Sequence, residues 1–108
     1  MTDKKLVLTT CGSAEEARRL AHQLVERRLA ACVNIVPQIE SAYRWQGKVE
    51  TASEFLLLIK TTAAVFDSLR RAIQELHSYE VPECIAISID AGTSSYLDWM
   101  AESVLPGS

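Results

Sequence analysis

Residues 50–62 read ETASEFLLLIKTT, with five consecutive apolar side chains at positions 55–59. Because successive side chains of a β-strand point to opposite faces of a sheet, a strand built from this segment is apolar on both faces. Such a strand lies at the centre of a sheet or is covered by a partner subunit. The segment therefore predicts a sheet whose two faces both need to be covered.

The preceding segment, residues 32–46, also has an extended pattern. Its strand-favouring residues are Val33, Ile35, Val36, Ile39, Tyr43 and Trp45. Pro37 cannot donate a hydrogen bond to a neighbouring strand, so we expect an edge position or a β-bulge there. The turn is supplied by residues 46–48, Gln-Gly-Lys. Together the two strands predict a β-hairpin that is long for a chain of 108 residues.

Two segments with helical spacing flank this hairpin. The first follows a capping box at residues 13–16, in which the serine bonds the amide three residues on and the glutamate reaches back. Its apolar face extends to Leu29, and we expect Arg27 and Arg28 to close the helix, as the helix dipole favours. A second helix is predicted over residues 65–76, before Pro82.

Short strands are predicted at residues 6–10 and 84–89, and a short final helix is capped by Ser94 or Ser95. The resulting order, βαββαβ with a long hairpin and a C-terminal helix, is that of an α+β, ferredoxin-like fold. Two helices then cover one face of a four-stranded antiparallel sheet. Self-association is the simplest cover for the other face, and residues 1–108 form a single domain.

Composition excludes several classes of function. The chain carries a net charge of −3, which argues against a nucleic-acid binder, because such proteins neutralise phosphates with a basic face. No apolar stretch is long enough to span a membrane. The N-terminus lacks the pattern of a signal peptide, so we expect a cytoplasmic protein. Its three cysteines are then expected to be free thiols.

Candidate metal ligands follow from the expected topology. In a sheet of strand order 4-1-3-2, the end of the first strand lies beside the start of the fourth, and the second helix ends there too. We therefore expect four residues to gather at one pole and to be candidate ligands of copper or zinc: Cys11, His77, Glu83 and Cys84. Cys32 falls at the opposite pole. The alternative is that both cysteines are packed as small apolar residues and that His77 simply ends a helix.

Enzymatic motifs are missing from the sequence. It has no glycine-rich phosphate loop, no G-x-S-x-G and no HExxH. Acylphosphatases share the expected fold class, but they need an arginine-bearing phosphate loop after the first strand. Residues 10–13, Thr-Cys-Gly-Ser, do not supply one. We therefore expect a protein that is not an enzyme.

Several sequence blocks, in order along the chain, resemble the CutA, or divalent-cation-tolerance, family. They include ACVNI at 31–35, SAYRWQGK at 41–48, HSYEVPE at 77–83 and GTSSYLDW at 92–99. The resemblance implies a non-enzymatic homotrimer, related to PII signalling proteins, whose long hairpins pair between subunits. It also implies tolerance of copper and other divalent cations, with heavy-metal ions bound weakly and no tightly bound cofactor.

The copper ligands proposed for some members of the family are only partly present. Those ligands are a cysteine in the first strand and two histidines before the Tyr-x-x-Pro-Glu block. Here the first strand carries Thr9, with Cys11 two positions later, and the histidine pair reads Leu76-His77.

The relation to PII proteins also implies a second possible function, a signalling or partner-binding module with a small-molecule cleft between subunits. Aromatic walls with a few polar groups are typical of such clefts. The residues that fit this description are Tyr43, Trp45, Lys60, Tyr79 and Tyr96. The alternative is that Tyr43 and Trp45 pack the hairpin against a neighbouring subunit, because large aromatic residues are enriched at interface cores.

Overall fold

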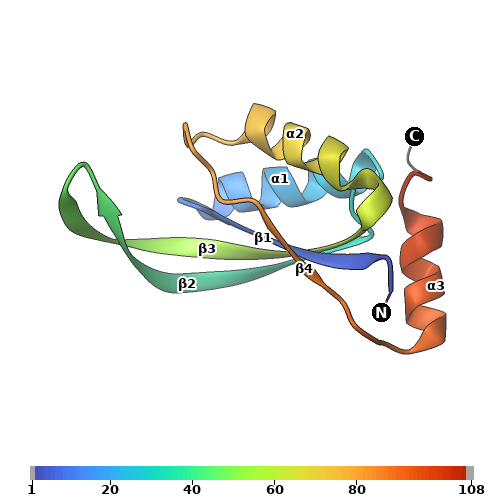
Figure 1. Ribbon diagram of the computed structural model, residues 1–108. Coiled ribbons are helices and arrows are strands. Elements are labelled where there is room, and N and C mark those ends of the chain that lie inside the picture. Colours follow the sequence, from blue (N-terminus) through green and yellow to red (C-terminus); the bar gives the residue numbers. More distant parts are fainter. Residues whose placement is uncertain (1, 107–108) are drawn as a thin grey trace.

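A computed structural model of the chain describes residues 2–106, and its elements follow the expected βαββαβ order with an added C-terminal helix (Figure 1). The strands are β1 (Lys4–Cys11), β2 (Cys32–Trp45), β3 (Lys48–Thr62) and β4 (Ile85–Ser88). The helices are α1 (Ala14–Glu26), α2 (Phe66–Leu76) and α3 (Ser94–Ser103), with a 3-10 turn, Ala63–Val65, before α2.

The four strands form one antiparallel sheet in the order β2-β3-β1-β4. Strand β3, with its doubly apolar run, is central as predicted. Helices α1 and α2 both lie on one side of this sheet, and α3 stands at the end opposite the hairpin (Figure 1). The expected α+β fold class and strand order are therefore confirmed.

The core fills the space between the sheet and the two helices. Every second residue of β1 and β3 points toward the helices, and the helices contribute the apolar faces that the sequence predicted. The largest side chains of this core with no exposed surface are Val7, Leu57, Ile59, Leu20, Leu24, Leu69 and Ile73. Burying side chains of this kind stabilises the fold by about 1.5–3 kcal/mol each.

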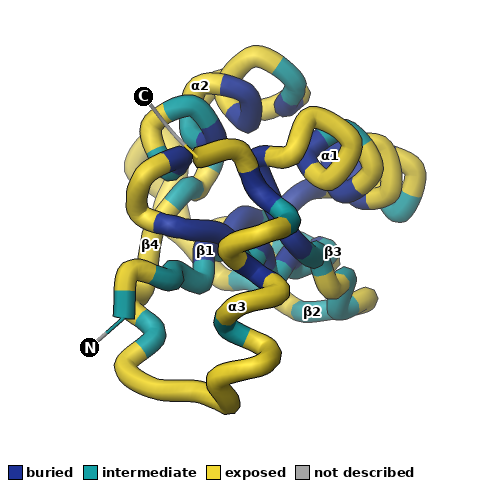
Figure 2. Tube along the Cα trace, turned by 90° about the vertical axis from the view of Figure 1, so that its right-hand side faces the viewer, coloured by how far each residue is buried: buried dark blue, intermediate teal, exposed yellow. Residues whose placement is uncertain are grey.

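The opposite face of the sheet is apolar, and neither α1 nor α2 covers it within residues 2–106. Cross-strand register places Leu8 beside both Leu58 and Ile85 on this face, and Leu6 beside Ile87. Ile85 and Ile87 are 52% and 47% exposed, and every residue of β4 is exposed (Figure 2). Exposed apolar residues gathered on one sheet face are typical of an interaction surface.

The hairpin extends beyond the sheet as a two-stranded ribbon. Strand β1 pairs with β3 only as far as Phe55, whereas β2 stays paired with β3 up to Trp45 and Lys48. The two turn residues, Gln46 and Gly47, have φ angles of 50° and 80°, as a type I′ turn requires. At Pro37, where an edge position or a β-bulge was expected, β2 is an outer strand and its register shifts between Val36 and Ile39.

Arg27 is the C-cap of α1, as predicted, whereas the predicted N-cap of α3 is wrong. Helix α1 stops at Glu26, because Arg28 adopts a left-handed conformation (φ 60°) and the Leu29 amide donates to the Leu24 carbonyl at 2.9 Å. The Arg28 side chain donates instead to the Glu102 carbonyl of α3, at 2.7 Å. Helix α3 begins at Ser94, so neither predicted serine is its N-cap. Thr93 holds that position without a side-chain hydrogen bond.

Two fully buried threonines in the sheet give a matched test of the core. The Thr61 hydroxyl donates to the Leu29 carbonyl at 2.7 Å, whereas the Thr9 hydroxyl has no partner within residues 2–106. We expect Thr9→Val to stabilise the protein by about 1 kcal/mol and Thr61→Val to destabilise it by about 1–2 kcal/mol. Chemical denaturation at one fixed protein concentration measures both. Equal effects of the two substitutions would contradict this assignment.

Candidate functional site

The His77 side chain fixes the loop between α2 and β4 to the end of β1. This side chain is fully buried, and its Nε2 lies 2.7 Å from the carbonyl oxygen of Thr10. Its Nδ1 lies 2.9 Å from the backbone nitrogen of Tyr79. Because a carbonyl only accepts and an amide only donates, Nε2 carries the proton and Nδ1 accepts. Both ring nitrogens are therefore occupied by the backbone.

Glu16 secures the same loop from α1. The side chain of Ser13 accepts the Glu16 amide at 3.1 Å, which confirms the N-cap. The Glu16 carboxylate does not complete the capping box, because it accepts the Ser78 amide at 2.7 Å instead. Burial acts to raise the pKa of Glu16, but the hydrogen bonds that its carboxylate accepts, with Ser78 foremost, outweigh burial, so the pKa lies below the usual value.

The Tyr79 side chain connects this loop to the hairpin. Its hydroxyl donates to Glu54 at 2.7 Å and lies 3.3 Å from where a β-carbon would stand at Gly12. The missing side chain of Gly12 thus leaves room for the tyrosine to pass. Burial, the hydrogen bond to Glu54 and its charge raise the pKa of Tyr79 far above the usual value, so the hydroxyl remains a donor.

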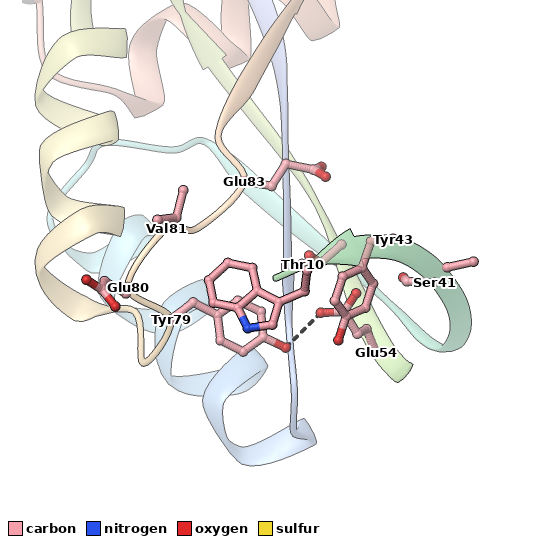
Figure 3. Close-up of a pocket in the computed structure, with 10 residues that line it drawn as sticks. Thr10, Ser41, Tyr43, Glu54, Tyr79, Glu80, Val81 and Glu83 are labelled. Carbon is pink, nitrogen blue, oxygen red and sulfur yellow. Dashed lines mark hydrogen bonds between the residues drawn. The ribbon is translucent and has the colours of Figure 1, made fainter. Parts of the chain in front are cut away.

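A cleft of about 650 Å³ opens between the hairpin and this loop (Figure 3). Aromatic and acidic side chains dominate its lining, with the Glu54–Tyr79 hydrogen bond inside it. They are Tyr43, Trp45 and Tyr79, and Glu54, Glu80 and Glu83. Its volume is within the range of small-molecule sites. Within residues 2–106, no lysine or arginine lines this cleft.

The four predicted metal ligands do not form a metal centre within one chain. Cys11 is fully buried in the core, and burial, with Glu16 and Glu54 nearby, raises the pKa of its thiol to about 11. Both nitrogens of His77 are occupied. Cys84 packs against the core, and burial raises the pKa of its thiol too, while Glu83 lines the cleft. Among residues 2–106, no three His, Cys, Asp or Glu side chains lie close enough to hold an ion.

The His77–Thr10 hydrogen bond brings the end of α2 to the end of β1, as the expected sheet topology requires. Within one chain, the positions of these residues agree with the alternative interpretation, in which the two cysteines pack as apolar residues and His77 has a structural role. Cys32 lies elsewhere in the sheet, opposite Lys60 in the β2–β3 register.

The predicted aromatic set is divided between two parts of the subunit. Tyr43, Trp45 and Tyr79 line the cleft. Lys60 instead donates a hydrogen bond to Asn34 on the uncovered sheet face. Tyr96 contacts Trp99 in α3, with ring centres 5.3 Å apart and the rings tilted by 42°. Sequence reasoning missed Glu16 and Glu54 as parts of this site. Glu54 could have been noticed because it is a charged residue directly before the apolar run of β3.

The Glu16–Ser78 hydrogen bond predicts a pH-dependent loss of stability. A carboxylate whose pKa is lowered in the folded state contributes stability above its unfolded pKa, and this contribution disappears as the pH falls through the folded value. We expect Glu16→Gln, which keeps the shape but not the charge, to cost about 1 kcal/mol at neutral pH. The difference from the unmodified protein should begin to shrink below about pH 5, where the unfolded carboxyl starts to take up a proton, and should be lost as the pH falls through the lowered folded pKa.

Chemical denaturation across this pH range measures the effect, with exposed Glu75→Gln as the control. A difference for Glu16→Gln that stays constant down to the lowest pH would contradict the role given to its charge.

Comparison with known proteins shows similarity along nearly the whole chain. A family model described as "CutA1 divalent ion tolerance protein" matches residues 5–103. The divalent-cation tolerance protein CutA of Thermus thermophilus is 51% identical over 100 residues, covering 93% of this chain and 97% of that protein. The chloroplastic protein CutA of Arabidopsis thaliana is 45% identical over 98 residues, but the match covers 54% of its length and 91% of this chain.

Solved structures agree with the sequence matches. The Cut A1 structure from Thermus thermophilus superposes with a TM-score of 0.92 at 50% identity, covering 94% of this chain and 98% of that one. The structure of the periplasmic CutA from Archaeoglobus fulgidus gives 0.91 at 42% identity, covering 94% and 99%. Within residues 2–106, no helix is both long and apolar enough to cross a membrane. The chain belongs to the CutA1 divalent ion tolerance family.

Proposed function

We propose that the chain acts in divalent-cation tolerance as a non-enzymatic, cytoplasmic homotrimer that associates with heavy-metal ions, copper among them, weakly. The observation that carries the assembly is the uncovered apolar sheet face. Its residues are Leu6, Leu8, Leu56, Leu58, Ile85 and Ile87. A chain of 108 residues gains stability when a second copy covers such a face.

The edges of the sheet support the same assembly. Strands β2 and β4 are the two outer strands, so each presents unpaired backbone donors and acceptors. Pairing the long edge of β2 in one copy with β4 of the next is a head-to-tail contact, which closes into a ring if the rotation between copies permits it. A ring of three copies is what the resemblance to the CutA family implies.

Weak metal association is supported by the chemistry of the cleft. Its lining carboxylates, Glu54, Glu80 and Glu83, attract cations. Within residues 2–106, however, no three potential ligands converge on one point, so an ion would keep most of its water. An ion held in this way exchanges readily, and such exchange suits buffering of a metal better than storage.

The sheet face gives the direct test of assembly. Light scattering should return about three times 12.0 kDa for the unmodified protein. We expect Ile87→Lys to lower this mass, because a charge buried in an obligate interface is strongly destabilising. Val25→Lys adds the same charge to an exposed position of α1 and should leave the mass unchanged. A monodisperse monomer of the unmodified protein would rule out the proposed assembly.

Copper titration of the reduced protein tests the metal proposal. We expect a micromolar-affinity indicator to remove Cu(I) and Cu(II) completely, because no preformed ligand set is present in residues 2–106. His77→Gln should leave the weak binding unchanged if the mutant retains its fold by circular dichroism. Copper retained stoichiometrically against the indicator, and lost in His77→Gln, would show a real centre and contradict the proposal.

A second candidate function is small-molecule binding, as in a PII-like signalling module. The observation that favours it is the aromatic-walled cleft, in which Tyr43 and Trp45 remain 44% and 50% exposed although they are large apolar side chains. Aromatic side chains with a few placed polar groups are the usual walls of ligand sites. This function is compatible with the first, because the cleft and the apolar sheet face use different residues.

A further inference from the structure

The inference concerns the cleft and rests on the second candidate function. Three aromatic side chains and three carboxylates line it, and within residues 2–106 no basic side chain does. Aromatic rings present a negative face to a ligand, so the rings and the carboxylates attract the same sign of charge. An anionic ligand would be repelled by both groups.

The carboxylate of Glu54 is held in place by its neighbours. It is 7% exposed, and its Oε2 accepts the Tyr79 hydroxyl. Within residues 2–106, the structure gives no hydrogen-bond donor to the other oxygen, Oε1. Tyr79 is itself held by the His77 ring, so the carboxylate is positioned in advance of any ligand. A buried carboxylate with no cationic partner in its cleft favours a ligand that carries the missing positive charge.

The residues that line the cleft favour an organic cation over a metal ion. A hydrated metal ion needs several converging oxygen ligands, and residues 2–106 do not provide them here. An organic ammonium group is bulky and weakly hydrated, so it gains from the faces of Tyr43 and Trp45 as well as from a carboxylate. The cleft, at about 650 Å³, is large enough for such a molecule.

We propose that the cleft between the hairpin and residues 77–83 binds organic ammonium compounds. The ammonium group lies against the aromatic faces of Tyr43 and Trp45, with Glu54 as its counter-charge. Tyr79 acts as a positioning residue, because it orients Glu54 through its hydroxyl. Glu83 contributes to the negative potential at the mouth of the cleft.

Choline provides a simple probe, with a matched neutral control. In the control compound a carbon atom replaces the ammonium nitrogen, so the two molecules have the same shape. In a Trp99→Phe background, Trp45 is the single tryptophan and its fluorescence reports on the cleft. We expect choline to change this fluorescence saturably and to bind at least about tenfold more tightly than the neutral compound. Equal affinity for the two compounds, or no response to choline, overturns the proposal.

Variants identify the counter-charge. Glu54→Gln keeps the acceptor for Tyr79 and should weaken choline binding about tenfold, and Glu83→Gln should weaken it by a smaller factor. Glu75→Gln on α2 lies outside the cleft and should have no effect. Unaltered choline affinity in both Glu54→Gln and Glu83→Gln, with folding verified by circular dichroism, overturns the proposal. Such a failure leaves the mass and copper results of the proposed function untouched, so the two can fail separately.

Discussion

The buried ring of His77 has one backbone group on each nitrogen, the Thr10 carbonyl and the Tyr79 amide. This pair of hydrogen bonds places the loop 77–83 across the end of β1. The carboxylate of Glu16 adds a third bond through Ser78. If the loop were not held there, Tyr79 would not reach Glu54, and the cleft would lose one of its walls. The cleft therefore depends on a histidine that does not itself line it.

The central strand β3 links this site to the proposed assembly. Its buried face carries Leu57 and Ile59 against the helices, and its other face carries Leu56 and Leu58 toward the uncovered side. Beyond the sheet, the same strand contributes Glu54 to the cleft. One continuous segment thus supplies the core, the proposed subunit contact and the proposed ligand contact. Changes in subunit packing would be expected to alter the cleft, because no flexible linker separates them.

Periodicity and turn residues were sufficient to predict the hairpin and the order of elements, and that order, read as a ferredoxin-like fold, predicted the sheet order. Pro37 predicted an edge position or a bulge. Side-chain direction was not predictable at the same level. Cys11 and His77 were placed correctly at one pole, but the thiol points into the core and the ring bonds the backbone. The capping-box prediction failed at Glu16 because its real partner, Ser78, is 62 residues away in the sequence. Contacts of that range depend on the finished fold.

The structural role of His77 is tested most directly by its protonation pattern. Long-range proton–nitrogen NMR correlations distinguish the two neutral tautomers, and His22→Gln assigns the signals, because the chain has two histidines. The account predicts a proton on Nε2, a bare Nδ1, and ring signals that do not change when copper is added. A proton on Nδ1, or loss of the His77 signals at equimolar copper, would contradict it.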